Sequence, residues 1–284
     1  MLPLPTIASR VMTTPGFTFP RTSAKLEQLI SDTTTPSEVV LAIISSDPLL
    51  TALVLSQANQ GGEGVTKLSD AMRTVGLGGV IGLMRGFIPL PPTAHDTLTA
   101  CWRQAAACSY MTRLLARQVA NHLPNTELDD IDDETLTTAG LLHDLGSPLA
   151  FVRFPAEYAK AVARLDAGEG PFEKLLTQEL GADPSDLGYL LARSWNLPPL
   201  ISSCMRFHSR PGKADGHHDL VATVHIARLL VRACGFVAGR DRFINGVDGD
   251  ALSRLHLRLD DFPKLLDRFF VEWEEREMFE TGAS

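Results

Sequence analysis

A histidine and an aspartate stand side by side at His143 and Asp144, within the heptapeptide GLLHDLG of residues 140–146. An imidazole nitrogen and a carboxylate oxygen can both reach one metal ion, and such a pair can organise the hydrolysis of a phosphate ester. The same dipeptide also suits a helix end, where a capping Asp follows a packed His. Taken alone, the dipeptide favours the capping interpretation.

Other residue types that could do chemistry fit structural roles better. The acidic run over residues 129–133 lacks the glycine and the terminal Glu of a calcium-binding loop, so it indicates a solvated loop that starts a helix. His225 falls on an apolar helical stretch, where a hydrogen-bonded core histidine is expected. The four cysteines form no C-x-x-C pair and indicate buried free thiols rather than a zinc or redox site: Cys101, Cys108, Cys204 and Cys234.

The elements that must position these side chains are predicted to be helices. Of the 284 residues, 44% are hydrophobic and 7% aromatic, and no alternating apolar run indicates a strand. A chain of this length can bury two modest cores, so we expect an all-α protein of two packed subdomains.

Charge and hydropathy exclude two kinds of partner. The formal net charge of −8 argues against binding to the phosphate backbone of nucleic acid. The first residues lack the pattern of a signal peptide, and no stretch of about 18 apolar residues is present to span a membrane. We therefore expect a soluble, cytoplasmic protein with no nucleic acid and no membrane among its partners.

Capping residues mark where helices begin. Thr35-Pro36 and Asp47-Pro48 each place a side-chain oxygen before a proline, which predicts helices over residues 36–45 and 48–59. Helical spacing of apolar residues predicts further helices over residues 68–75, 98–122, 136–142, 184–195 and 220–234, with a tight turn at the glycines of residues 76–79.

A proline-rich segment, Pro89 to Pro92, divides the chain. It cannot continue a helix and favours an extended connection. The predicted organisation is an N-terminal helical subdomain over residues 1–90, a second helical subdomain over 91–236 and a C-terminal helical extension over 237–284.

Several separated segments resemble one family in the correct order: the HDOD family of the HD superfamily. The resemblance is carried by Phe19-Pro20, residues 44–59 (ISSDPLLTALVLSQAN), 71–77 (AMRTVGL), Trp102, the heptapeptide of residues 140–146, 187–191 (LGYLL) with 195–198 (WNLP), and Phe207-His208. These segments extend over about residues 17–235. The resemblance implies an N-terminal helical subdomain packed on an HD-like helical subdomain.

In catalytic HD-superfamily members the metal ligands are an early His, the His-Asp pair, a late Asp and, with two metals, two further His. Only His143, Asp144 and His208 match this pattern. The other positions are changed: Gln104, Pro184, Ser209 and Arg228 stand where ligands would be, and Ser147 replaces a frequent Lys. A divalent ion needs several anionic or imidazole ligands, so we expect a degenerate site with no metal and no cofactor. Any metal would use His143, Asp144 and His208.

We expect an Asp144–Arg228 ion pair or a hydrogen-bonded network in the former metal cavity. The leading hypothesis is a non-catalytic HDOD signal-transduction module that binds a signalling protein, for which a cyclic-dinucleotide signalling enzyme or a regulator is a candidate. One alternative is a residual metal-dependent phosphohydrolase acting on a nucleotide or cyclic dinucleotide through His143, Asp144 and His208. Another is a sensor that binds a nucleotide or other anion through Arg228. Fold analogy does not choose among them or indicate an oligomeric state.

Overall fold

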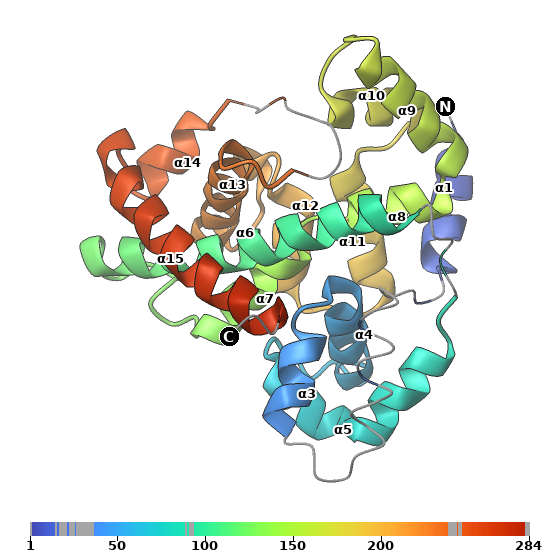
Figure 1. Ribbon diagram of the computed structural model, residues 1–284, viewed down its shortest axis with the longest axis horizontal. Helices are drawn as coiled ribbons and strands as arrows, with labels where there is room; N and C mark the ends of the chain where they lie inside the picture. The colour runs from blue at the N-terminus through green and yellow to red at the C-terminus, as the bar shows by residue number, and fades with distance from the viewer. Residues whose placement is uncertain are drawn as a thin grey trace.

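Helices form every regular element in the part of the chain that the structure, a computed structural model, describes: residues 2–14, 16, 22, 26, 37–88, 90, 94–237, 243 and 246–281 (Figure 1). This confirms the predicted all-α class. The N-terminal helices are α1 (Leu4–Met12), α3 (Ser37–Ile44), α4 (Pro48–Ala58) and α5 (Leu68–Arg85).

The larger group of helices, named the HD-like group after the resemblance noted above, is built around α6 (His95–His122), which contacts α7 (Asp133–Leu142) and α13 (His218–Ala233). The rest of this group comprises α8 (Gly146–Arg153), α9 (Pro155–Asp166), α10 (Phe172–Leu180), α11 (Pro184–Ser194), α12 (Pro199–Phe207) and the 3-10 turn η2 (Pro211–Lys213). The C-terminal elements are α14 (Gly249–Arg254), the 3-10 turn η3 (Leu259–Asp261) and α15 (Phe262–Thr281).

The three aspartate caps that the sequence predicts start α4, α7 and α11. The Asp47 carboxylate accepts hydrogen bonds from the amides of Leu49 and Leu50 at 3.1 and 3.0 Å, at the start of α4. Asp132, from the acidic run, accepts from the Thr135 amide at 3.0 Å, and Asp183 accepts from the Ser185 amide at 2.8 Å. Each cap satisfies an amide that lacks an intrahelical partner.

Two sequence expectations differ from the structure. The predicted turn at residues 76–79 is a kink: only Gly76 leaves helical geometry, with φ of 65°, and α5 continues to Arg85. Glycine permits this φ without steric cost. Helix α1 was not anticipated, and it contacts α8 and α11 of the HD-like group. The predicted start at Thr35-Pro36 and the prolines Pro89, Pro91 and Pro92 lie outside the described residues.

The two glycines of the heptapeptide stand where helices approach most closely. A Cβ on Gly140 would lie 2.6 Å from the Thr112 hydroxyl and 2.8 Å from the Cys108 carbonyl oxygen, so α7 packs tightly on α6. A Cβ on Gly146 would lie 1.8 Å from the Pro184 carbonyl oxygen, which brings the start of α8 against the start of α11. These contacts hold the intervening His143 and Asp144 in the middle of the HD-like group.

The C-terminal helix α15 packs on α6, the long central helix. Its buried Trp273 and Phe269 meet Phe236, with ring centroids 4.9 and 5.8 Å apart. Arg113 of α6 forms an ion pair with Glu272 of α15. Among the described residues no single helix has the length and composition to cross a membrane, and one bent pair of helices, residues 38–44 with 48–58 at 112°, meets both criteria together.

Candidate functional site

His143 directly follows α7, as the C-cap residue of that helix, and is buried. Its Nδ1 lies 2.7 Å from the Gly140 carbonyl oxygen, so Nδ1 carries the hydrogen and donates it. The other ring nitrogen, Nε2, is buried and has no hydrogen-bond partner among the described residues. A neutral imidazole whose Nε2 lone pair is available has the form of a metal ligand. Whether a metal site exists therefore depends on the neighbouring groups.

Asp144 follows in the turn between α7 and α8. Its Oδ1 accepts hydrogen bonds from the Ser147 hydroxyl at 2.7 Å and the Ser147 amide at 3.3 Å. Ser147 is the residue that replaces the frequent Lys of catalytic relatives. The contacts are those of a carboxylate that caps the start of a helix, the role that the dipeptide alone favours.

His208 comes to His143 from α12, 65 positions later in the chain by residue number. The two rings meet edge to face with centroids 5.0 Å apart. His208 Nδ1 lies 3.2 Å from the carbonyl oxygens of Cys204 and Met205. Gln104 of α6 is 2% exposed and lines the same small cavity as His143 and Asp144. The structure thus brings four of the predicted positions together.

Arg228 is buried on α13 and forms an ion pair with Glu173 of α10. Of the carboxylates that the structure describes, Glu173 rather than Asp144 lies within ion-pair distance of this guanidinium. The predicted Asp144–Arg228 pair is therefore replaced by a pair with a residue that sequence reasoning missed. No pattern around Glu173 signals this role, because the contact joins helices far apart in the chain.

Burial and charge set the protonation of the His-Asp pair. Burial lowers the pKa of His143 to about 3, and the electrostatic influence of His208 and Arg228 adds to this effect against that of Asp144. Burial alone would raise the pKa of Asp144, but His208, Arg228 and His143 outweigh it and the pKa lies below its ordinary value. At neutral pH the site holds a neutral imidazole beside a carboxylate.

The residues around this pair do not fit the metal that the resemblance to the HD superfamily implies. Among the described residues no group of three or more His, Cys, Asp or Glu side chains is placed to hold an ion. The cavity at the pair measures about 10 Å³, the space of about one water, and is lined by Cys101, Gln104, Ala105, His143, Asp144, Ser147 and Pro148. A phosphate ester needs far more room.

The two remaining predicted positions have structural partners. Pro184 is the first residue of α11, and its carbonyl faces Gly146. The Ser209 hydroxyl lies 2.9 Å from the Ser185 hydroxyl. A two-metal site needs imidazoles at both positions. Here one position holds the proline that starts α11 and the other holds a serine that is hydrogen-bonded to Ser185.

The cysteines bear out the expectation of free thiols. Cys101, Cys108 and Cys204 are buried, and Cys234 is half-buried. Burial raises the pKa of Cys108 to about 12, so this thiol stays protonated.

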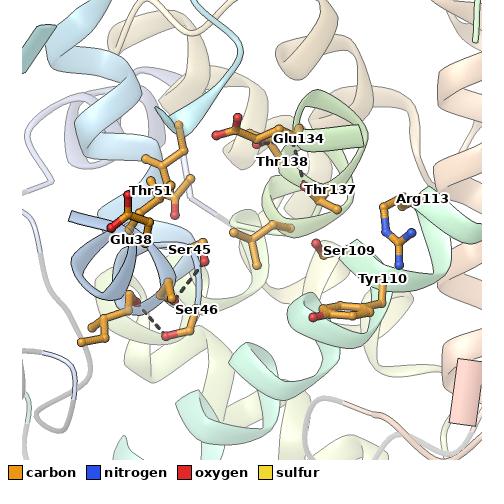
Figure 2. A pocket seen from close by; sticks show the side chains of 15 residues that line it. Glu38, Ser45, Ser46, Thr51, Ser109, Tyr110, Arg113, Glu134, Thr137 and Thr138 are labelled. Carbon is orange, nitrogen blue, oxygen red and sulfur yellow. Dashed lines mark hydrogen bonds between the residues drawn. The ribbon is translucent and has the colours of Figure 1, made fainter. Parts of the chain in front are cut away.

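A second, larger cavity lies between α3 and the helices α6 and α7, with a volume of about 510 Å³ (Figure 2). Sequence reasoning did not identify it. The available signal was a group of short hydroxyl residues on otherwise apolar helices: Ser45, Ser46, Thr51, Ser109, Thr137 and Thr138.

Comparison with known proteins places the chain in a family. The model of the HDOD domain matches residues 17–211. A curated relative, an uncharacterized protein of Treponema pallidum (strain Nichols), is 26% identical over 200 residues, which are 68% of this chain and 37% of that protein. The chain thus spans about a third of that relative's length.

Two solved structures share the fold. The MmoQ response regulator from Methylococcus capsulatus str. Bath aligns with a TM-score of 0.63 and 19% identity, over 88% of this chain and 97% of that one. A virulence factor from Campylobacter jejuni subsp. jejuni aligns with a TM-score of 0.57 and 22% identity, over 80% of each chain. Since the HDOD model covers more than half of the sequence and the fold agrees, this chain belongs to the HDOD family.

Proposed function

We propose that this protein is a non-catalytic HDOD signal-transduction module that acts in the cytoplasm by binding a partner protein. Family membership supports a regulatory role, and one structurally similar protein carries the name of a response regulator. A signalling protein, including an enzyme or regulator of cyclic-dinucleotide signalling, is the partner class we propose. No nucleic acid and no membrane takes part.

The observation that carries the proposal is the closed His143-Asp144 position. Its cavity of about 10 Å³ leaves no room for a phosphate ester, and the Asp144 carboxylate already accepts two hydrogen bonds from Ser147. The charge of Arg228 acts on the pair where a divalent cation would need negative charge. Each feature opposes hydrolysis without disturbing the helices that a docking partner would contact.

A residual phosphohydrolase is the second candidate, because the buried Nε2 of His143 has no hydrogen-bond partner in the described part of the chain and Asp144 is ionised. His143, Asp144 and His208 would hold the ion, and the ion would polarise the phosphate ester. This reading requires the helices around the pair to open, since substrate cannot enter the cavity described above.

Metal content and hydrolysis separate the two candidates. The purified protein and a double variant, His143→Gln with Asp144→Asn, are each incubated with Mn²⁺ or Fe²⁺ and with bis(p-nitrophenyl) phosphate or a cyclic dinucleotide. We expect less than stoichiometric metal by mass spectrometry and equal, background hydrolysis for both proteins. Metal-dependent hydrolysis that the double variant loses would overturn the non-catalytic assignment.

Partner binding is tested by reconstitution. A tagged full-length chain is used to isolate bound proteins from its host, and each candidate is then purified and titrated by calorimetry. We expect saturable binding to a signalling protein, unchanged in the double variant because the His-Asp pair is not the contact. If purified candidates fail to bind, or bind only through an intact His-Asp pair, the proposal is wrong.

A further inference from the structure

The cavity of about 510 Å³ in Figure 2 lies away from the His143-Asp144 pair and has the size of a small-molecule site. One wall comes from α3 and the turn after it, and the facing walls come from α6 and α7. The floor is apolar, formed by Leu41, Ile43, Leu68 and Leu141. An occupant would therefore touch both the N-terminal helices and the HD-like group.

Five of the seven hydroxyl groups that line this cavity, those other than Ser109 and Tyr110, have already used their hydrogens. Ser45 and Ser46 donate to the carbonyl oxygens of Ala42 and Ile43 at 2.9 and 2.7 Å. Thr51 donates to the Ile44 carbonyl at 2.8 Å, and Thr137 and Thr138 both donate to the Glu134 carbonyl at 2.8 Å. A hydroxyl has one hydrogen and two lone pairs, so these side chains can offer a ligand only acceptors.

The charges of the cavity point the same way. Glu38 and Glu134 contribute carboxylates, and Glu134 is held by the Ser69 amide at 2.5 Å and the Ser69 hydroxyl at 2.6 Å. Arg113 is the one basic residue among the described lining residues, and it pairs with Glu272 and, at 4.0 Å, with Asp133. The C-terminal end of α3 adds the negative end of a helix dipole at Ile44.

We propose that this cavity is a binding site for a small organic cation, an ammonium or guanidinium compound with an apolar body. The cationic group donates hydrogen bonds to the hydroxyl oxygens and carboxylates, and the apolar body covers the leucine and isoleucine floor. An anion such as a nucleotide is disfavoured, because five of the hydroxyl groups and both carboxylates can only accept hydrogen bonds and the arginine is already paired. The site is independent of the proposed loss of metal chemistry.

The test compares two probes of similar shape and opposite charge: 2-phenylethylammonium and 3-phenylpropanoate. Binding to the full-length protein is measured by saturation-transfer NMR and calorimetry. We expect saturable binding of the ammonium probe and at least tenfold weaker binding of the carboxylate. Absent binding of the ammonium probe, or equal binding of both, would overturn the proposal.

Matched variants locate the probe. Ala42→Phe fills the cavity from the exposed face of α3 and should abolish binding, whereas Ala159→Phe, on the exposed face of α9, should not change it. Glu38→Gln should weaken binding of the ammonium probe about threefold, as expected for an exposed charge. Glu157→Gln on α9 should not change the binding of this probe. Binding that survives Ala42→Phe would place the probe elsewhere and refute the assignment. Thermal unfolding of each variant checks that the fold is intact.

Discussion

Replacing Gly146 with alanine perturbs the contact between the starts of α8 and α11. The new Cβ would lie 1.8 Å from the Pro184 carbonyl oxygen, 2.6 Å from its carbonyl carbon and 3.0 Å from the Gly188 amide nitrogen. All three atoms belong to the backbone, so no side-chain rotation can relieve the clash. The two helices must move apart to restore ordinary contact.

The expected cost follows from this displacement. Ordinary Cβ contacts begin at 3.4 Å, so the separation must grow by about 1.6 Å along the contact. Overpacking a buried site costs roughly 1–3 kcal/mol of stability. The cost here should lie at the upper end of this range, because the atoms that the new Cβ meets belong to the backbone. Alanine regains up to about 1 kcal/mol of helix propensity. We expect a net loss of about 2–3 kcal/mol in the free energy of unfolding.

Urea unfolding at equilibrium measures this loss. With an m value of about 3 kcal/mol per molar, the midpoint should fall by about 0.7–1 M. Gly78→Ala is the matched control, because Gly78 lies in α5 with no atom within 4 Å of its added Cβ. That variant should be unchanged or up to about 1 kcal/mol more stable. If Gly146→Ala lies within about 0.5 kcal/mol of the unmodified protein, the close approach described above is wrong.

Three further predictions concern stability. Asp47→Ala removes the two amide hydrogen bonds that cap α4 and should cost about 1–2 kcal/mol, measured by thermal melting of the circular dichroism signal; an unchanged melting temperature would contradict the cap. Glu173→Gln removes the negative charge that pairs with the buried Arg228 and should cost about 2–3 kcal/mol in urea unfolding. Glu179→Gln on the same helix breaks the pair with the more exposed Arg164 and should cost less than Glu173→Gln, so equal losses would refute the assigned burial of Arg228. In the folded protein the pKa of His143 is lowered to about 3, whereas in the unfolded chain it has the ordinary value of 6.5. Between these pH values the unfolded chain binds one more proton than the folded protein, so the free energy of unfolding falls as pH drops from 6.5 toward 3. His143→Gln should remove up to about 1.4 kcal/mol per pH unit of this dependence between pH 6 and 4, and an identical slope in both proteins would refute the burial of a neutral imidazole.

The elements that could be predicted are those fixed by local chemistry. Asp47-Pro48 and Asp183-Pro184 identify helix starts, because a capping oxygen followed by proline acts within one turn. Helix α1 could not be predicted in the same way. Its buried residues Ile7 and Val11 are stabilised by packing against α8 and α11, more than 130 positions later in the chain.

The candidate site divides in a similar way. The convergence of Gln104, His143, Asp144 and His208 follows from the order of the family segments, which fixes how α6, α7 and α12 pack. Glu173 as the partner of Arg228 could not be anticipated, because the long guanidinium can reach several helices and only tertiary packing selects among them. The large cavity was missed for the same reason: its walls come from helices of both groups.

The position of α1 has a consequence for the topology of the protein. The chain starts on the HD-like half, where the Leu2 amide donates to the Leu180 carbonyl at 3.0 Å and the Arg153 guanidinium donates to the Arg10 carbonyl at 3.2 Å. It then builds α3, α4 and α5 before returning to that half at α6. The helices α3, α4 and α5 thus lie between two stretches of chain that pack in the HD-like group, and a fragment that begins after the proline segment would lose the contacts of α1 with α8 and α11.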